Sequence, residues 1–317
     1  MSEIIEQPVV NFDRDASKKS NGSRSVTQFL RVSAWLSFIL NVVIIATGGT
    51  VRLTASGLGC TEWPVCTPGS LTPIPETGIH GIIEFANRTL SAPVLILGIL
   101  VFILSLRLRK QRKDLLVLSA LVLLLVIAQA LLGAFVVWFK LNANLVGVHY
   151  VASLVIVCIA AAYLVRMNQP KAPRIWVVPT GYAVLTFVTA LFMVVTIYVG
   201  VLTTGAGPHS GDANVIRQGF DATLLSHVHA WPGYITLALI LVLMFWAARQ
   251  RLRPMRWTIA VLIAMLVQIA VGVYQARTGL PPVAVGIHMV LASLTAAGMT
   301  VLTLRLRDPK PLTPQHS

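Results

Sequence analysis

Eight long apolar stretches constrain the fold of this chain more than any other feature of its sequence. Each has about 20 residues or more, the length that an α-helix needs to cross the hydrocarbon core of a membrane. Only helices and closed barrels satisfy every backbone hydrogen bond in that environment. The stretches are Val32–Val51, Ile82–Leu104, Leu115–Phe139, Val146–Val165, Trp176–Leu202, Leu225–Ala247, Trp257–Ala276 and Val283–Leu304. The sequence therefore predicts an all-α polytopic membrane protein with eight transmembrane helices.

The amount and the placement of charge agree with this class. Only 11% of the residues are charged, against about 25% in an ordinary soluble protein. Of the 25 basic residues, 20 fall on alternate loops and on the two tails. By the positive-inside rule both termini are cytoplasmic in a multi-pass protein of the cell membrane. The net charge of +14 is then a topology signal, and no nucleic-acid partner is expected. The residues are Arg14, Lys18, Lys19, Arg24, Arg31, Arg107, Arg109, Lys110, Arg112, Lys113, Arg166, Lys171, Arg174, Arg249, Arg251, Arg253, Arg256, Arg305, Arg307 and Lys310.

Two polar tails and one basic linker divide the chain. Residues 1–31 are predicted to be a disordered cytoplasmic tail, because they are polar and lack the apolar core of a cleavable signal peptide. Residues 306–317 are predicted to be a second cytoplasmic tail, and residues 167–175 a cytoplasmic linker. This linker separates an N-terminal four-helix half, residues 32–166, from a C-terminal half, residues 176–305.

One spaced motif occurs twice, 139 residues apart. In both copies a Gln is followed after three residues by a Gly, and after thirteen more by a Gly-x-His triplet. We interpret this as an internal duplication, so the halves are predicted to be two pseudo-symmetric four-helix bundles related by an axis along the membrane normal. The alternative, close helix packing through small residues, explains the glycines but not the histidines. The residues are Gln129, Gly133, Gly147 and His149 in one copy, and Gln268, Gly272, Gly286 and His288 in the other.

Histidines gather at one predicted depth, near the outer ends of the even-numbered spans. One such histidine is most often an ordinary packing or interfacial residue. Facing imidazoles in a helical bundle, however, are how membrane proteins hold haem iron. A bare metal ion is less well supported, because no cysteine or carboxylate motif completes its ligands. His209 falls in an outer loop, and His316 in the tail is uninformative. The histidines at the common depth are His80, His149, His227, His229 and His288.

The second span carries a carboxylate. His80, Glu84 and Asn87 are spaced so that they share one helix face, and Arg88 can pair with Glu84 four residues before it. A carboxylate inside a membrane helix is costly and usually functional. We interpret Glu84 as a general base near a buried reaction centre. The alternative is an ion pair with Arg88 that only anchors the end of the helix.

The loop after the first span contains Cys60 and Cys66 on either side of Trp63, on the predicted oxidising side of the membrane. The two cysteines can close a short disulfide loop, or they can form a redox-active pair. Cys158 lies inside the fourth span and is interpreted as a packing residue.

Together these motifs resemble the haem A synthase family over about residues 30–305. The carrying residues are Arg52-Leu-Thr54-x-Ser56-Gly57-x-x-Cys60, Trp63-Pro64-x-Cys66, Glu84-Phe-x-Asn87-Arg88, Gln129-x-x-x-Gly133 with His149, His227, and Gln268-x-x-x-Gly272 with His288. The resemblance implies oxidation of the C8 methyl group of haem O to a formyl group by successive hydroxylations, which supports the haem supply of cytochrome oxidase. Haem O would be the substrate and haem b the resident cofactor.

The resemblance also implies roles for single residues. His227 and His288 would ligate the iron of haem b in the C-terminal half, with His229 as the reserve for His227. His149 would ligate or orient the substrate haem in the N-terminal half. Glu84 would act in catalysis, and the family has a cysteine pair where Cys60 and Cys66 stand.

The sequence departs from the family pattern at two places. The family commonly has His where this chain has Asn87, and Asn is a poor iron ligand, so whether His149 is the one protein ligand of the substrate iron stays open; Asn87 is kept as a candidate residue of the substrate-haem site. The second outer loop, residues 203–223, has no cysteines.

Arg52 is expected to pair with a haem propionate or to serve as an interfacial anchor. The expected partners are haem O, the haem O synthase that supplies it, an unidentified electron acceptor and the lipid bilayer. The alternative function is a non-catalytic di-haem b-type membrane electron-transfer protein.

Overall fold

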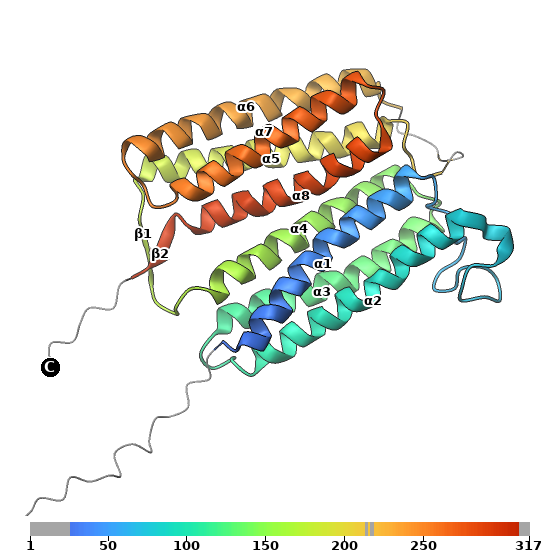
Figure 1. Cartoon of the computed structure of the whole chain (residues 1–317), viewed down its shortest axis with the longest axis horizontal. Coiled ribbons are helices and arrows are strands. Elements are labelled where there is room, and N and C mark those ends of the chain that lie inside the picture. The colour runs from blue at the N-terminus through green and yellow to red at the C-terminus, as the bar shows by residue number, and fades with distance from the viewer. Residues whose placement is uncertain (1–25, 213–214, 216–218, 311–317) are drawn as a thin grey trace, which may run out of the picture.

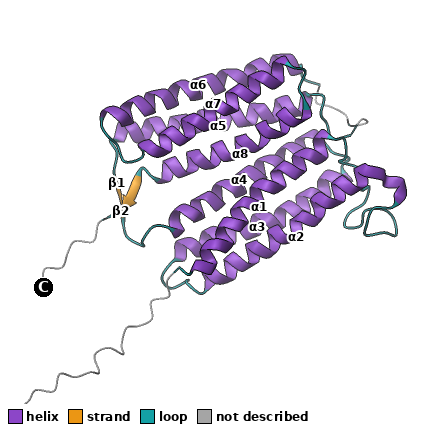
Figure 2. Ribbon diagram, viewed as in Figure 1, coloured by secondary structure: helices purple, strands orange, loops and turns teal. Residues whose placement is uncertain are grey.

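The computed structural model describes residues 26–212, 215 and 219–310, and eight long helices dominate this part of the chain (Figure 2). All eight are long and apolar enough to cross a membrane, as the sequence predicts. A 3-10 helix, η2 (Pro75–Thr77), precedes α2, and two short strands complete the described elements. The helices are α1 (Gln28–Leu53), α2 (Gly78–Leu106), α3 (Lys113–Trp138), α4 (Ala143–Met167), α5 (Thr180–Ala206), α6 (Ala222–Arg249), α7 (Met255–Arg277) and α8 (Pro282–Leu304).

The first helix begins inside the predicted tail. Thr27 caps α1, because its hydroxyl oxygen accepts the backbone N–H of Leu30 at 3.2 Å. Residues 28–31, predicted to be disordered, are therefore helical. The rest of that tail and the end of the other, residues 1–25 and 311–317 with His316, lie outside the described residues.

The fifth helix begins later than predicted, at Thr180 instead of Trp176, directly after Pro179. The preceding residues form strand β1 (Arg174–Trp176), which pairs antiparallel with β2 (Arg307–Pro309). The guanidinium of Arg307 also lies 3.8 Å from the ring centroid of Trp176. Residues 307–309 of the predicted tail are thus ordered by backbone pairing with a distant segment.

The eight helices form two groups of four that meet along α4 and α8 (Figure 1). Within the first group α1 packs on α2, α2 on α3, and α3 on α4, and the same succession joins α5 to α8. This correspondence supports the predicted duplication. Apolar side chains of α1, α4 and α8 fill the junction, and they are Ile45, Leu154, Val157, Ala161, Val165, Ala297 and Val301.

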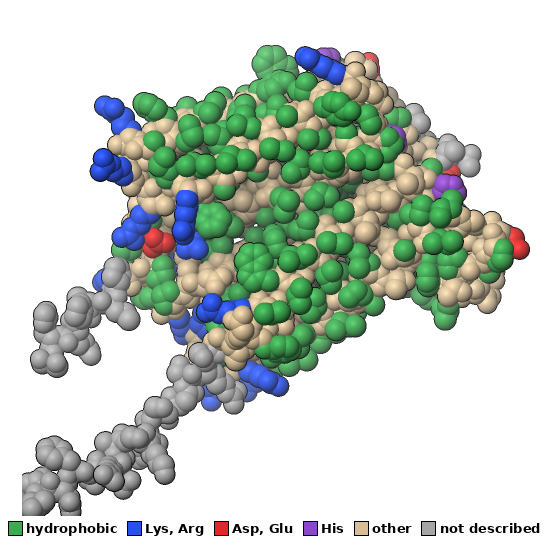
Figure 3. Space-filling view, viewed as in Figure 1, with side chains coloured by type: hydrophobic (Ala, Val, Ile, Leu, Met, Phe, Trp, Pro, Cys, Tyr) green, Lys and Arg blue, Asp and Glu red, His purple; other side chains and the backbone are tan. Residues whose placement is uncertain are grey.

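The two ends of the helices differ in charge (Figure 3). Most Lys and Arg side chains visible on this face gather at the end where β1 and β2 lie, and histidines appear toward the opposite end. We call these the basic end, which carries Arg107, Arg166, Arg249 and Arg305, and the histidine end, which carries His80, His149, His229 and His288. Exposed Leu, Ile, Val and Phe side chains cover the helices between them, as a lipid-facing surface requires.

Candidate functional site

Two imidazoles face each other at the histidine end of the C-terminal half. The carboxylate of Asp221 caps α6 by accepting the backbone N–H groups of Thr223 and Leu224 at 2.7 and 3.1 Å. This cap sets the start of the helix and places His229 about two turns along it. The ring centroid of His229 lies 6.3 Å from that of His288 on α8, with the ring planes at 80°.

Helix α5 holds the ring of His229. Its Nδ1 atom lies 2.9 Å from the backbone carbonyl oxygen of Thr196, so an Nδ1–H donated there leaves Nε2 free. Metal-bound histidines are commonly oriented in this way by a carbonyl on the other ring nitrogen. A Cβ atom on Gly200 would come within 2.8 Å of the His229 ring, so the ring occupies space that only glycine leaves open.

His288 is held by the repeated motif. The Gln268 side-chain amide donates to the backbone carbonyl of His288 at 3.1 Å and lies 3.3 Å from the Nε2 atom of its ring. A Cβ on Gly272 would come within 2.9 Å of the same ring. The Nδ1 atom of His288 is buried and has no hydrogen-bond partner among the described residues. A neutral imidazole with an unpartnered nitrogen beside a second imidazole fits a haem iron.

His227 lies elsewhere. Its side chain is exposed, whereas that of His229 is partly buried against α5 and α8. Two residues on a helix are separated by about 200° of rotation, so the two histidines cannot face the same neighbour. The structure therefore brings His229 to His288, and the predicted pair of His227 and His288 is not formed.

The N-terminal half repeats this arrangement around His149. The Gln129 side-chain amide donates to the backbone carbonyl of His149 at 2.8 Å and to the Ser153 hydroxyl at 2.6 Å. Gly133 faces this ring: a Cβ atom added to the glycine would lie 3.7 Å from Cε1 of His149. Within the described chain the buried Nδ1 atom of His149 also has no hydrogen-bond partner. The duplicated sequence motif is thus a duplicated structural unit, in which a Gln of one helix holds a His of the next.

Asn87 does not supply a second imidazole to this half. Its side-chain oxygen accepts the hydroxyl of Thr47 on α1 at 2.7 Å. An amide whose oxygen is already engaged is a poor iron ligand. In this geometry the amide of Asn87 is engaged by α1 and is not directed to a ligand beside His149.

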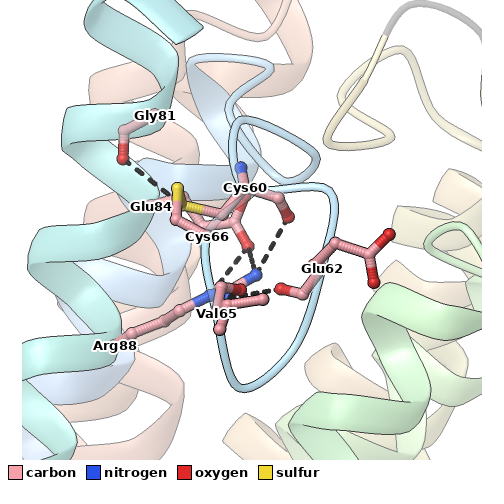
Figure 4. A network of polar contacts seen from close by, with 7 residues as sticks. All are labelled: Cys60, Glu62, Val65, Cys66, Gly81, Glu84 and Arg88. Atoms are coloured by element: carbon pink, nitrogen blue, oxygen red, sulfur yellow. Dashed lines mark hydrogen bonds and ion pairs between the residues drawn. A yellow bond between two sulfur atoms is a disulfide. The ribbon is translucent and has the colours of Figure 1, made fainter. Parts of the chain in front are cut away.

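Glu84 and Arg88 hold the outer loop against α2 (Figure 4). Glu84 is 4% exposed, and its Oε2 accepts the backbone N–H of Cys60 at 2.8 Å. Its Oε1 accepts from Nε of Arg88 at 3.1 Å. Arg88 also donates to the backbone carbonyls of Cys60, Glu62 and Val65 at 3.0, 2.7 and 3.1 Å. We call this group the loop clamp. The ion pair considered as an alternative is present, and it fastens a loop as well as a helix end.

The clamped loop contains a disulfide between Cys60 and Cys66, and both cysteines are completely buried. The predicted disulfide is therefore confirmed, and Cys158 is free. The loop packs directly on the start of α2, because a Cβ on Gly59 would overlap the backbone of His80. The Ser56 hydroxyl lies 2.9 Å from Nδ1 of His80, which is inside the first turn of α2 and not before it as predicted.

Arg52 connects the two halves at the histidine end. It donates from Nη2 to the backbone carbonyl of Thr204, in the last turn of α5, at 2.7 Å. A second link, from the N–H of Gly57 to the carbonyl of Gly211 at 2.9 Å, lies beside it. The Nε atom of Arg52 is buried without a partner in the described chain. Arg52 is thus an anchor with one donor still free for an acidic group.

Residue types alone did not identify several of these contacts. Thr196 holds His229 through a backbone carbonyl, which any residue carries. The loop partners of Arg88 are also carbonyls, so the spacing from Glu84 predicts only the ion pair. Thr47 was identifiable only as a polar residue on a span, with no signal for its partner Asn87.

The family model and the relatives that match this chain point to the same kind of protein. The model of the COX15-CtaA family, described as cytochrome oxidase assembly protein, matches residues 31–208. The chain is 28% identical over 298 residues to a protein named Heme A synthase from Halalkalibacterium halodurans, covering 89% of this chain and 98% of that protein. It is 27% identical over 304 residues to a protein of the same name from Alkalihalophilus pseudofirmus, covering 88% and 98%. A third, from Exiguobacterium sibiricum, is 31% identical over 124 residues, covering 39% and 41%.

Proposed function

The chain belongs to the COX15-CtaA family of cytochrome oxidase assembly proteins, and we propose that it is a haem A synthase that oxidises the C8 methyl group of haem O to a formyl group. The relatives matched over nearly their whole length are named for haem A synthesis. The observation that carries the proposal is the facing pair His229 and His288, with its counterpart around His149 in the other half.

The C-terminal half is the proposed site of the resident haem b. His229 and His288 would hold its iron, because each has a ring nitrogen without a hydrogen-bond partner among the described residues. His227, the residue predicted from the resemblance, is assigned no ligand role because it is exposed and faces away. When bound, the haem supplies one-electron redox chemistry. The chain contributes the orientation of both imidazoles through Thr196 and Gln268.

The N-terminal half is the proposed site of the substrate. His149 would orient haem O through its unpartnered Nδ1, while Asn87 is turned to Thr47. Arg52 would offer its free Nε–H to a propionate at the histidine end. The substrate would thereby be fixed by one imidazole and one guanidinium, both on helices that meet at the junction of the two halves.

Glu84 is the proposed proton acceptor during oxidation of the methyl group. Its carboxylate is also part of the loop clamp, with one oxygen on Cys60 N–H and the other on Arg88. A carboxylate has about four lone-pair positions, so Glu84 can take up a proton while these bonds remain. In Glu84→Gln the amide oxygen can keep the bond to Cys60 N–H, but the side chain accepts no proton at neutral pH and its NH2 group cannot accept from Arg88. Arg88→Gln, which breaks the same ion pair and keeps the carboxylate, is therefore the control for the clamp.

For Glu84→Gln we expect haem b to remain bound while haem O accumulates in the membranes. Extraction and chromatography of the haems measure this ratio. Normal haem A output from the Gln variant, together with lost output from Glu84→Ala, would assign Glu84 to the clamp alone.

Haem O synthase is the proposed source of the substrate, and an electron acceptor of unassigned identity is the proposed second partner. The non-catalytic di-haem electron carrier is not supported, since the long matches are to proteins named for a synthase. The deciding experiment is expression in cells that make haem O but no haem A. Appearance of haem A that depends on this chain supports the proposal. A purified protein that carries only haem b and produces no haem A would instead support the non-catalytic di-haem electron-transfer protein.

A further inference from the structure

Four arginines converge at the basic end, where the two halves meet. The guanidinium of Arg166 is close enough to Arg112, Arg174 and Arg305 for their charges to act on it. Arg166 lies in the last turn of α4 and Arg305 caps α8, and they are 139 residues apart, as are His149 and His288. Each half therefore contributes the same arginine to one place.

The two carboxylates nearby form their ion pairs with arginines other than Arg166, Arg174 and Arg305. Asp114 is paired with Arg112, at 3.1 Å from Nε and 3.0 Å from Nη2. Asp308 is paired with Arg253 at 3.3 Å. Arg166, Arg174 and Arg305 consequently make no ion pair of their own among the described residues.

Several N–H donors of this region are buried and unsatisfied. The Nε atoms of Arg174 and Arg305 and the Nε2 atom of Gln169 have no hydrogen-bond partner among the described residues. Gln169 is 5% exposed, and its side-chain oxygen accepts from Arg166 at 3.4 Å. A buried donor left unpaired destabilises the folded protein. Burial also lowers the pKa of Arg174 and of Arg305, and the nearby carboxylates of Asp114 and Asp308 offset this effect only in part. The unpaired N–H groups of Arg174, Arg305 and Gln169 could therefore be satisfied by a bound anion.

We propose that Arg166, Arg174 and Arg305, together with Gln169, bind the phosphate group of an anionic phospholipid. We call these residues the arginine cluster. Guanidinium groups match phosphate oxygens in pairs. The last helical residues beside the cluster, Met167 and Leu304, end two apolar spans, which puts it at the level of lipid headgroups. Figure 3 shows the surface hollowed between the two groups of helices near this end, where acyl chains would lie.

This site is distinct from the histidine end, and the proposal does not rest on haem chemistry. The headgroup would join the end of α4 to that of α8 and to the strand pair β1 and β2. The bound lipid would therefore stabilise the junction between the halves.

Native mass spectrometry of the purified full chain tests the proposal. The protein in detergent is titrated with phosphatidylglycerol, with phosphatidylcholine of the same acyl chains, or with inorganic phosphate. We expect one phosphatidylglycerol to bind at least about tenfold more tightly than phosphatidylcholine. In Arg174→Gln/Arg305→Gln this preference should fall about tenfold or more, since each lost basic residue weakens headgroup attraction by about 1 kcal/mol.

The matched control is Arg109→Gln/Arg249→Gln, which removes the same charge from exposed arginines at the basic end. It should keep the preference within about twofold. Equal loss in both double variants would overturn the proposal, because attraction to the general surface charge would then explain binding. Displacement of the lipid by equimolar inorganic phosphate would overturn the headgroup assignment and leave a free-phosphate site.

If Arg174→Gln/Arg305→Gln does not fold, hydrogen exchange of the unmodified chain provides a second test of the proposal. Phosphatidylglycerol should slow exchange at residues 166–176 and 304–309. It should not slow exchange in the basic loop between α6 and α7. Uniform protection of both regions would contradict a specific site.

Discussion

The Tyr150 hydroxyl donates a hydrogen bond of 2.8 Å to the backbone carbonyl of Met289, and the two residues occupy the same position in the two copies of the repeated motif, 139 residues apart. Each follows a motif histidine directly. Helices α4 and α8 therefore meet at equivalent turns, and the two candidate haem sites lie on opposite sides of one contact. This geometry makes the junction of the halves a determinant of both sites.

Removal of this bond should loosen the junction. For Tyr150→Phe we expect a loss of about 0.6 kcal/mol in the free energy of unfolding, and at most about 2, the range measured for hydrogen bonds between membrane helices. Thermal unfolding in one detergent measures it. Tyr198→Phe, on an exposed face of α5, is the control and should change nothing. Equal effects of the two variants would contradict the role of Tyr150.

The two histidines of α6 should differ in haem binding. Because His229 faces His288 and His227 is exposed, His229→Ala should lower the affinity for haem b at least about tenfold, whereas His227→Ala should retain it. The ratio of haem absorbance to protein, and the spectrum of reduced minus oxidised protein, measure both. Loss of haem in His227→Ala with retention in His229→Ala would reverse our assignment.

The two motif glycines should tolerate alanine unequally. A Cβ on Gly272 would lie 2.9 Å from the His288 ring, which must shift, whereas a Cβ on Gly133 would lie 3.7 Å from the His149 ring in ordinary contact. We expect Gly272→Ala to change the midpoint potential of bound haem b and Gly133→Ala to leave it unchanged. A redox titration of each variant provides the measurement. Unchanged potentials in both would show that the His288 ring is not held as described.

The loop clamp should control the order of the outer loop. Arg88→Gln removes the charged donor that binds the carbonyls of Cys60, Glu62 and Val65. Hydrogen bonds to charged groups contribute about 1.5–3 kcal/mol each, so cleavage of the loop under limited proteolysis should accelerate more than about tenfold. Arg277→Gln, an exposed residue at the same end, is the control. An unchanged cleavage rate in Arg88→Gln would mean that the disulfide alone orders the loop.

A histidine at position 87 tests the N-terminal site. Asn87→His introduces the residue that the resembled family commonly has there, at the cost of the bond from Thr47. If haem O binds beside His149, the variant should shift substrate-bound iron toward the low-spin spectrum of two-imidazole ligation. The spectrum of the variant loaded with haem O measures this, with unloaded protein as reference. No spectral change would place the substrate iron away from Asn87.

Local sequence patterns were sufficient for much of this architecture. The length and apolarity of the eight spans predict eight helices because the membrane interior leaves the backbone few other ways to pair its polar groups. The spacing of Gln, Gly and His predicts the duplicated unit, because residues one turn apart share a helix face. The pair of β1 and β2 was not predictable, since three residues in each strand have no recognisable pattern.

By itself the sequence determined the helices, the duplication, the cysteine pair and the set of candidate histidines. Tertiary structure alone decided which of these groups meet. His227 and His229 are equally polar in one helix, and only the packing of α5 and α8 against α6 turns His229 toward His288. The same holds for Glu84, whose charge was visible in the sequence but whose loop partners are backbone groups. The physical reason is that hydropathy and spacing describe one helix at a time, whereas contacts between helices depend on the rotation of each helix relative to its neighbours.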